Sequence, residues 1–190
     1  MMAKIKVYAM QIEPQISSLA SLDFIAYVNP EGYLPNQFEG KVGAYAIFAQ
    51  DKTLQYVGYS RDIYLSLKQH LVRQPQLCCW LKVQTIDRPS RTALEGIRNT
   101  WIAENGTVPP GNNTEQSQWD QAIDVKAAMT PEEQARYQDP QLDPVAQQKV
   151  LKNAARRIEA EILAVLASRQ IQEALRFNPK LKDSGFLDLK

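Results

Sequence analysis

The chain has 190 residues, of which 44% are hydrophobic and 23% charged, with 22 Lys and Arg against 21 Asp and Glu. This length suits one domain, or one domain with an appended element, and the composition excludes collagen-like, largely disordered and disulfide-framework proteins. The two cysteines are adjacent and cannot close a loop, which fits a reducing compartment. No apolar run approaches the length of a membrane span, so we expect a cytoplasmic protein.

The first part of the chain predicts one short strand and then a hairpin. Residues 1–40 form an N-terminal segment whose apolar run, Phe24 to Val28, has strand preference. Residues 41–49 and 54–59 are rich in aromatic and β-branched side chains, and the polar turn 50–53 separates them. A break of this length between two strands predicts an antiparallel hairpin.

Two helices and a third strand are expected next. Ser60 is placed to cap a helix over residues 60–74. Residues 79–86 alternate in part between apolar and polar side chains, which predicts a strand. Ser90 opens a second helix that stops before Gly106. The order strand, strand, helix, strand, helix is that of a compact α/β unit with a short antiparallel sheet flanked by helices.

We assign this α/β domain to residues 41–114 and a mainly helical C-terminal extension to residues 115–190. Residues 107–118 predict a loop, and Thr130 marks a helix start. The longest helix is expected over residues 144–177, with an apolar stripe of Leu151, Ala155, Ile158, Ile162, Val165 and Leu166. The stripe can pack on its own domain, which is the default, pair with a second copy, or receive a protein partner.

The near-zero net charge conceals a local difference. Residues 41–114 hold nine basic and five acidic side chains, a net +4, whereas both flanking segments are slightly acidic. A mildly basic centre is compatible with phosphate binding, although a solvated surface explains the same charges. Weak binding of a nucleic acid is therefore the most that the charge predicts.

The informative pattern is Gly43-Ala44-Tyr45, ten further residues, and then Tyr56-Val57-Gly58. Two tyrosines on paired strands joined by a short turn can present both phenols to one side of a small sheet. Gly43 and Gly58 leave open backbone beside them. Ordinary strand aromatics would give the same spacing, and this alternative stays open.

Two later residues extend the pattern. Glu95, on the second helix, and an amide after the Pro-Pro-Gly loop, Asn112 or Asn113, are candidates to converge on the tyrosine pocket. A carboxylate suits a divalent cation, phenols can hydrogen-bond a water or a phosphate oxygen, and an amide can orient the network. This is the outline of a metal-assisted phosphodiester site, in which Tyr45 would take a proton from water. A solvated role for Glu95 is the competing interpretation.

These residues resemble the GIY-YIG nucleases, whose two strand motifs match Gly43-Ala44-Tyr45 and Tyr56-Val57-Gly58. The resemblance covers about residues 41–114. The string Val-Pro-Pro-Gly-Asn-Asn after the glutamate helix is similar to a branch in photosynthetic bacteria and to the nuclease-like domain fused to some plastid glutaredoxins. The resemblance to this family implies an endonuclease that acts on DNA with Mg²⁺ or Mn²⁺. In such a site Tyr45 and Tyr56 would line the pocket, Glu95 would bind the metal and Asn112 would position the network.

One departure from the family bears on activity. The family arginine, ten residues after the second tyrosine, is replaced by Ser66, and a serine cannot supply a fixed bidentate positive charge. Arg61 lies on a different side of the helix and cannot simply substitute, and Arg98 lies one turn beyond Glu95. Both remain candidates for contacting substrate. The family's small or basic residue after Tyr-x-Gly is also changed, to Tyr59.

Two functions therefore stay open. The first is a divalent-cation-dependent DNA endonuclease with a weakened site. The second is a catalytically impaired domain that binds or assembles with a protein partner, or with a second copy, through residues 144–177. For His70, the one histidine, a packing role is the simpler expectation. The Cys78-Cys79 pair has no partner at metal-ligand spacing, so no zinc site is expected.

Overall fold

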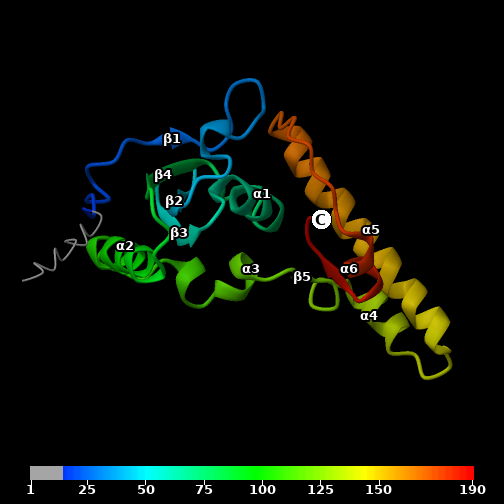
Figure 1. The fold of residues 1–190 in the computed structure, drawn as a ribbon. Coiled ribbons are helices and arrows are strands. Elements are labelled where there is room, and N and C mark those ends of the chain that lie inside the picture. Colours follow the sequence, from blue (N-terminus) through cyan, green and yellow to red (C-terminus); the bar gives the residue numbers. More distant parts are fainter. Residues whose placement is uncertain (1–14) are drawn as a thin grey trace, which may run out of the picture.

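The computed structural model describes residues 15–190, and a four-stranded antiparallel sheet lies at its centre (Figure 1). Its strands follow the order β1-β4-β2-β3, with bounds β1 (Ile25–Ala26), β2 (Gly43–Phe48), β3 (Leu54–Ser60) and β4 (Trp80–Thr85). The hairpin predicted from the two aromatic-rich segments is β2 paired with β3. The mixed α/β fold with a short antiparallel sheet and flanking helices is confirmed.

The two faces of the sheet carry different helices. Helix α1 (Ile63–Arg73) packs on one face, where Tyr45, Ile47 and Tyr56 share a core with Leu67. Helix α2 (Arg91–Glu104) packs on the other, in a second core made by Ala44, Ala46, Val57, Leu94, Ile97 and Trp101. Because side chains alternate along each strand, neighbouring residues of one motif face opposite helices.

The caps of these helices agree with the sequence in one case and differ in the other. The Ser90 hydroxyl accepts a hydrogen bond from the Ala93 amide at 3.2 Å and caps α2, as predicted. Helix α1 is capped by Asp62, whose Oδ1 accepts from the Leu65 amide at 3.1 Å, and the prediction of Ser60 was wrong. Ser60 stays in β3, opposite Gly43, so its backbone is committed to the sheet.

The segment predicted as a loop at 107–118 is partly helical. It contains the 3₁₀ turn η2 (Pro110–Asn112), and helix α3 (Gln116–Asp120) begins within it. The composition, rich in Pro, Gly and Asn, gave no sign of α3. Trp119 of α3 is fully buried in the core on the α1 side, and this packing holds the short helix in place.

The C-terminal extension is mainly helical, with α4 (Pro131–Tyr137), α5 (Pro144–Ser168) and α6 (Pro179–Asp183). A small hairpin also joins β5 (Ile123–Asp124) to β6 (Phe186–Leu187) and was not predicted. The expected start of α4 is confirmed by a capping box between Thr130 and Glu133. Of the apolar stripe predicted on α5, all residues except the half-buried Val165 are buried, so the helix packs on its own chain.

The longest helix ends at Ser168 rather than continuing to 177, so that part of the prediction was wrong. Gln170 adopts a left-handed backbone with φ 58°, and the Gln172 amide donates to the Gly32 carbonyl at 2.8 Å. The chain thereby turns back to the N-terminal segment, which includes the turn η1 (Asn36–Phe38). None of the helices within residues 15–190 is long and apolar enough to cross a membrane.

Candidate functional site

Tyr45 and Tyr56 lie together on the α1 face of the sheet, as their spacing predicts. Their ring centroids are 6.3 Å apart. The Tyr45 hydroxyl lies 2.9 Å from Nε2 of His70, and the Tyr56 hydroxyl donates to Oδ1 of Asp120 at 2.6 Å. Both phenols are therefore hydrogen-bonded within the protein.

This tyrosine cluster is closed to solvent. Tyr45 is 2% and Tyr56 7% exposed, and the Trp119 indole stacks on the Tyr56 ring at 5.2 Å with an interplanar angle of 1°. Burial raises the pKa of both phenols well above the ordinary value, and the nearby Asp120 raises that of Tyr56 further. In this arrangement neither phenol can reach a water on a substrate or readily give up its proton.

His70 completes the same cluster. It is 3% exposed, and burial together with the Arg73 charge lowers its pKa to about 3, so the imidazole is neutral at physiological pH. Its Nδ1 has no hydrogen-bond partner within the described residues. A packed, neutral histidine agrees with the packing role that we expected from the sequence.

The backbone beside the two motif glycines is covered rather than open. A Cβ on Gly43 would lie 2.3 Å from the Gln84 carbonyl oxygen of β4, and one on Gly58 would lie 2.8 Å from the Tyr45 hydroxyl. Glycine at these positions permits the close approach of neighbouring groups of the same chain. No room for a substrate remains beside either residue.

Glu95 lies on the α2 face, so the sheet separates it from the tyrosine cluster. Its Oε1 accepts hydrogen bonds from the Tyr59 hydroxyl at 3.1 Å and from Nε of Arg91 at 2.8 Å. Hydrogen bonds from Arg91, and then from Tyr59, lower the carboxyl pKa, so Glu95 is ionised at neutral pH. Within residues 15–190, no hydrogen bond reaches Oε2.

Beside Glu95 lies an open cavity of about 360 Å³, which we call the α2 cleft. It lies between the end of β3 and the start of α2, and its lining residues are Tyr59, Ser60, Arg61, Pro89, Ser90, Arg91 and Leu94. Two of them, Tyr59 and Arg91, are the hydrogen-bond donors to Glu95. Of the predicted site residues, Arg61 lines this cleft, whereas Tyr45 and Tyr56 do not. Glu95 adjoins the cleft through its hydrogen bonds with Tyr59 and Arg91.

Asn112 and Arg98 both hold the backbone of Val57. The Asn112 amide accepts from the Val57 N–H at 2.7 Å and donates to its carbonyl at 2.8 Å, while Nε of Arg98 donates to that carbonyl at 3.2 Å. These bonds give partners to the N–H and carbonyl groups of Val57 on the outer edge of β3. The same strand carries Tyr59, which lines the α2 cleft. In this geometry Asn112 positions a strand.

Ser66, at the family arginine position, turns towards the same region. Its hydroxyl donates to the Ser60 hydroxyl at 2.8 Å, and Ser60 lines the α2 cleft. The side chain is too short to enter the cleft itself. Ser66 therefore contacts one residue of the cleft but brings no positive charge to it.

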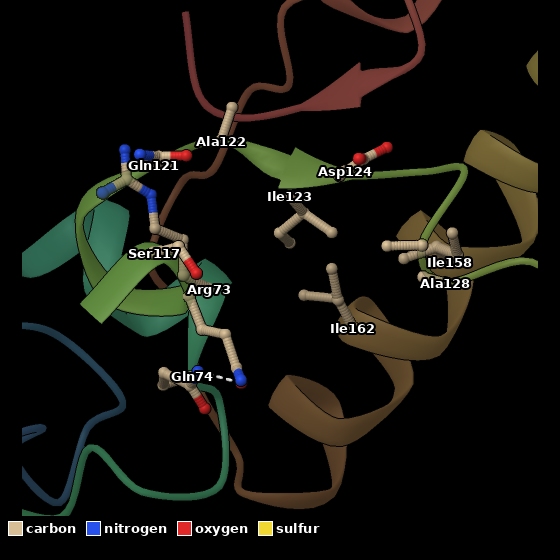
Figure 2. Close-up of a pocket in the computed structure, with 12 residues that line it drawn as sticks. Arg73, Gln74, Ser117, Gln121, Ala122, Ile123, Asp124, Ala128, Ile158 and Ile162 are labelled. Atoms are coloured by element: carbon tan, nitrogen blue, oxygen red, sulfur yellow. Dashed lines mark hydrogen bonds between the residues drawn. The ribbon is translucent and has the colours of Figure 1, made fainter. Parts of the chain in front are cut away.

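A larger cavity of about 680 Å³ lies between α3 and α5 (Figure 2). Polar residues near α1 and α3, including Arg73, Gln74 and Ser117, face Ile158 and Ile162 of α5 across it. None of the predicted site residues lines it. Arg61 instead lines the smaller α2 cleft together with Arg91, the hydrogen-bond partner of Glu95.

Several residues that contact the tyrosine cluster or line the α2 cleft were not predicted from the sequence. Arg91 precedes Glu95 by four positions on one helix, a spacing that places their side chains side by side and could have indicated the pair. Asp120 and Trp119 gave no comparable signal, because their contacts with Tyr56 depend on the path of the chain between distant elements.

Comparison with known proteins gives one informative match. No protein-family model matches the chain. Among curated proteins, it is similar to the chloroplastic bifunctional monothiol glutaredoxin-S16 of Arabidopsis thaliana, with 38% identity over 76 residues. The aligned part covers 38% of this chain and 26% of that protein. The chain therefore matches about a quarter of its relative's length.

Proposed function

We propose that this chain is a divalent-cation-dependent endonuclease of the GIY-YIG type that hydrolyses phosphodiester bonds of DNA in the α2 cleft. The observation that carries the proposal is the geometry of Glu95: its Oε1 accepts from Tyr59 and Arg91, two residues that line the α2 cleft, and its Oε2 receives no hydrogen bond within residues 15–190. Anionic metal ligands next to guanidinium groups suit a phosphate that needs both charge neutralisation and positioning.

The donor set fits a magnesium-like cation that is shared with the substrate. Within residues 15–190, no group of three or more His, Cys, Asp or Glu is arranged to hold a metal. Mg²⁺ is commonly bound by one or two carboxylates together with waters and substrate phosphates, so Glu95 alone is a sufficient protein anchor for Mg²⁺ or Mn²⁺. The bound cation would polarise the phosphate and offset the charge of the leaving oxygen.

The protein residues would perform the remaining tasks. Hydrolysis adds a water oxygen to phosphorus, breaks one P–O ester bond, and transfers the proton of water to the leaving oxygen. Tyr59 keeps Glu95 oriented, and Asn112 holds the strand that carries Tyr59. Because Tyr45 is enclosed on the α1 face of the sheet, the proton transfer expected of it from the sequence has no part in this proposal.

The plastid relative supports a shared domain but not a shared thiol chemistry. Its name assigns it a monothiol glutaredoxin function among others. In this chain Cys78 is fully buried, and burial raises its pKa to about 12, so little reactive thiolate forms at neutral pH. The likeness therefore favours the nuclease-like part of such fusions. Two free cysteines also agree with a reducing cytoplasm.

A plasmid-nicking assay with Mg²⁺ or Mn²⁺ tests the proposal with wild type, Glu95→Ala and Tyr45→Phe. We expect Glu95→Ala to lower the nicking rate at least ~100-fold, because it removes the cation anchor. Tyr45→Phe should retain most activity, because its hydroxyl does not reach the cleft. Nicking that survives Glu95→Ala would come from a contaminant and would rule out this enzyme function.

The alternative function is a catalytically impaired domain that acts in binding or assembly. The enclosed tyrosines favour it, as do two apolar side chains on the outside of α5, Val145 (76% exposed) and Leu163 (42% exposed). It predicts purified wild-type protein without Glu95-dependent nicking. It also predicts concentration-dependent self-association, or capture of a protein partner, that is lost in Leu163→Glu and measurable by analytical ultracentrifugation.

A further inference from the structure

We infer that Arg61 and Arg91 together bind the scissile phosphate and supply the positive charge that Ser66 cannot. This inference rests on the proposed function; it gives Arg61, a substrate-contact candidate from the sequence, a defined role and adds Arg91. Both arginines line the α2 cleft, Arg61 from the junction of β3 with α1 and Arg91 from the first turn of α2. A phosphate in the cleft would lie between them.

Arg91 is oriented for this task by Glu95. Its Nε donates to Glu95 Oε1, whereas its two terminal nitrogens make no hydrogen bond within the described part of the chain. The side chain is 84% exposed, so those nitrogens are free to meet a phosphate. A guanidinium presents parallel N–H groups that match two phosphate oxygens. Because the bond from Nε to Glu95 already restricts the Arg91 side chain, less side-chain entropy is lost when a phosphate binds.

Arg61 lines the same cleft as Arg91 and is exposed. The start of α2 adds to the field between them, because the N-terminus of a helix carries partial positive charge and free N–H groups. The Ser90 hydroxyl caps one of these amides, and Ser90 is among the residues that line the cleft. The ionised Glu95 beside this cluster limits its attraction for phosphate unless a cation is present.

The other cations of the two helices are engaged elsewhere. Lys68 forms an ion pair with Glu173 at 2.7 Å, and Arg73 with Asp188 at 2.6 Å. Arg98 donates to the Val57 carbonyl. Each of these side chains would lose a protein partner on turning to substrate, whereas Arg61 and the terminal nitrogens of Arg91 would lose none within residues 15–190.

Salt dependence measures this role separately from catalysis. A short fluorescein-labelled DNA duplex is titrated with Arg61→Gln, Arg91→Gln and the double variant in EDTA over a range of salt concentrations, with anisotropy as the readout. Each lost phosphate contact should reduce the slope of log K against log salt by about 0.9. Arg156→Gln, an exposed arginine on α5, is the matched control and should leave the slope unchanged.

A single-turnover cleavage assay of the same variants with Mg²⁺ forms the second arm. The double variant should cleave at least ~100-fold more slowly than wild type, because it removes the phosphate-binding charges. Unchanged salt slopes in Arg61→Gln and Arg91→Gln would overturn the inference, even where Glu95-dependent cleavage establishes the proposed function. Reduced slopes without any Glu95-dependent cleavage would instead support phosphate binding and reject catalysis.

Discussion

His70 shows how one buried side chain links the tyrosine cluster to pH. It is the sole histidine of the chain, and its Nε2 meets the Tyr45 hydroxyl at 2.9 Å while Trp119 packs 5.6 Å away between ring centroids. Protonation would place a charge in a site where burial and Arg73 both oppose it. The folded protein therefore keeps His70 neutral over a range in which the unfolded chain binds a proton.

The resulting prediction concerns acid stability. The pKa of His70 is about 3 in the folded protein and about 6.5 in an unfolded chain, so its contribution is complete above pH ~6.5 and is lost as the pH falls towards 3. Between these two pH values, each unit by which the pH falls should lower the free energy of unfolding by about 1.4 kcal/mol through His70. In urea unfolding at several pH values, the free energy of unfolding should depend less steeply on pH for His70→Phe than for wild type. Parallel curves for the two proteins would refute the assignment.

The residue scale also shows what sequence patterns could reveal about the site. The tyrosine spacing correctly placed two phenols together, because hairpin register and side-chain alternation follow from the sequence. The expected meeting with Glu95 does not occur, because the glutamate packs on the opposite face of the sheet, with Tyr59. The strand pattern gave the alternation, but not the face that α2 would cover.

At the scale of elements, local capping signals were the most reliable. Ser90 and Thr130 cap the helices that they were predicted to open, because an N-cap interaction involves only neighbouring residues, whereas the predicted cap at Ser60 is replaced by Asp62, two residues on. The elements that were missed, α3 and the β5–β6 hairpin, depend on contacts between distant segments. The predicted length of α5 was too great for the same reason, because the hydrogen bond between Gln172 and Gly32 turns the chain away from the helix.

The most deeply buried ion pair between α1 and the C-terminal region, within residues 15–190, joins Arg73 to Asp188. Arg73 and Asp188 are 2.6 Å apart, with side chains 7% and 10% exposed. Asp188→Ala would leave the guanidinium enclosed without its counter-ion, so we expect a loss of about 3 kcal/mol in unfolding free energy. The pair Lys152–Asp183 is more exposed, and Asp183→Ala should cost less than about 1 kcal/mol.

Guanidinium chloride unfolding of the two variants and wild type provides the measurement. Both substitutions remove one carboxylate from the C-terminal region, so Asp183→Ala controls for the change in net charge. Equal losses of stability in the two variants would mean that α1 is not anchored through Asp188.

Over the whole molecule, one core joins the three predicted regions. Tyr27 and Leu34 of the N-terminal segment share it with the tyrosines of the sheet and with Ile158 of α5. This continuity encloses the tyrosine cluster, whereas Arg61 and Arg91 lie exposed in the α2 cleft, where β3 ends and α2 begins. The modest positive charge of residues 41–114 includes both arginines that line the α2 cleft.

In the proposed site, a cation held by Glu95 and a phosphate held by Arg61 and Arg91 meet at the α2 cleft. Backbone ¹H–¹⁵N chemical shifts, recorded during titration with Mg²⁺ and thymidine 5′-monophosphate, test this arrangement directly. We predict shift changes centred on Tyr59, Arg61, Arg91 and Glu95, and their loss in Glu95→Gln. Changes centred on His70 and Trp119, or changes that persist in Glu95→Gln, would contradict the account.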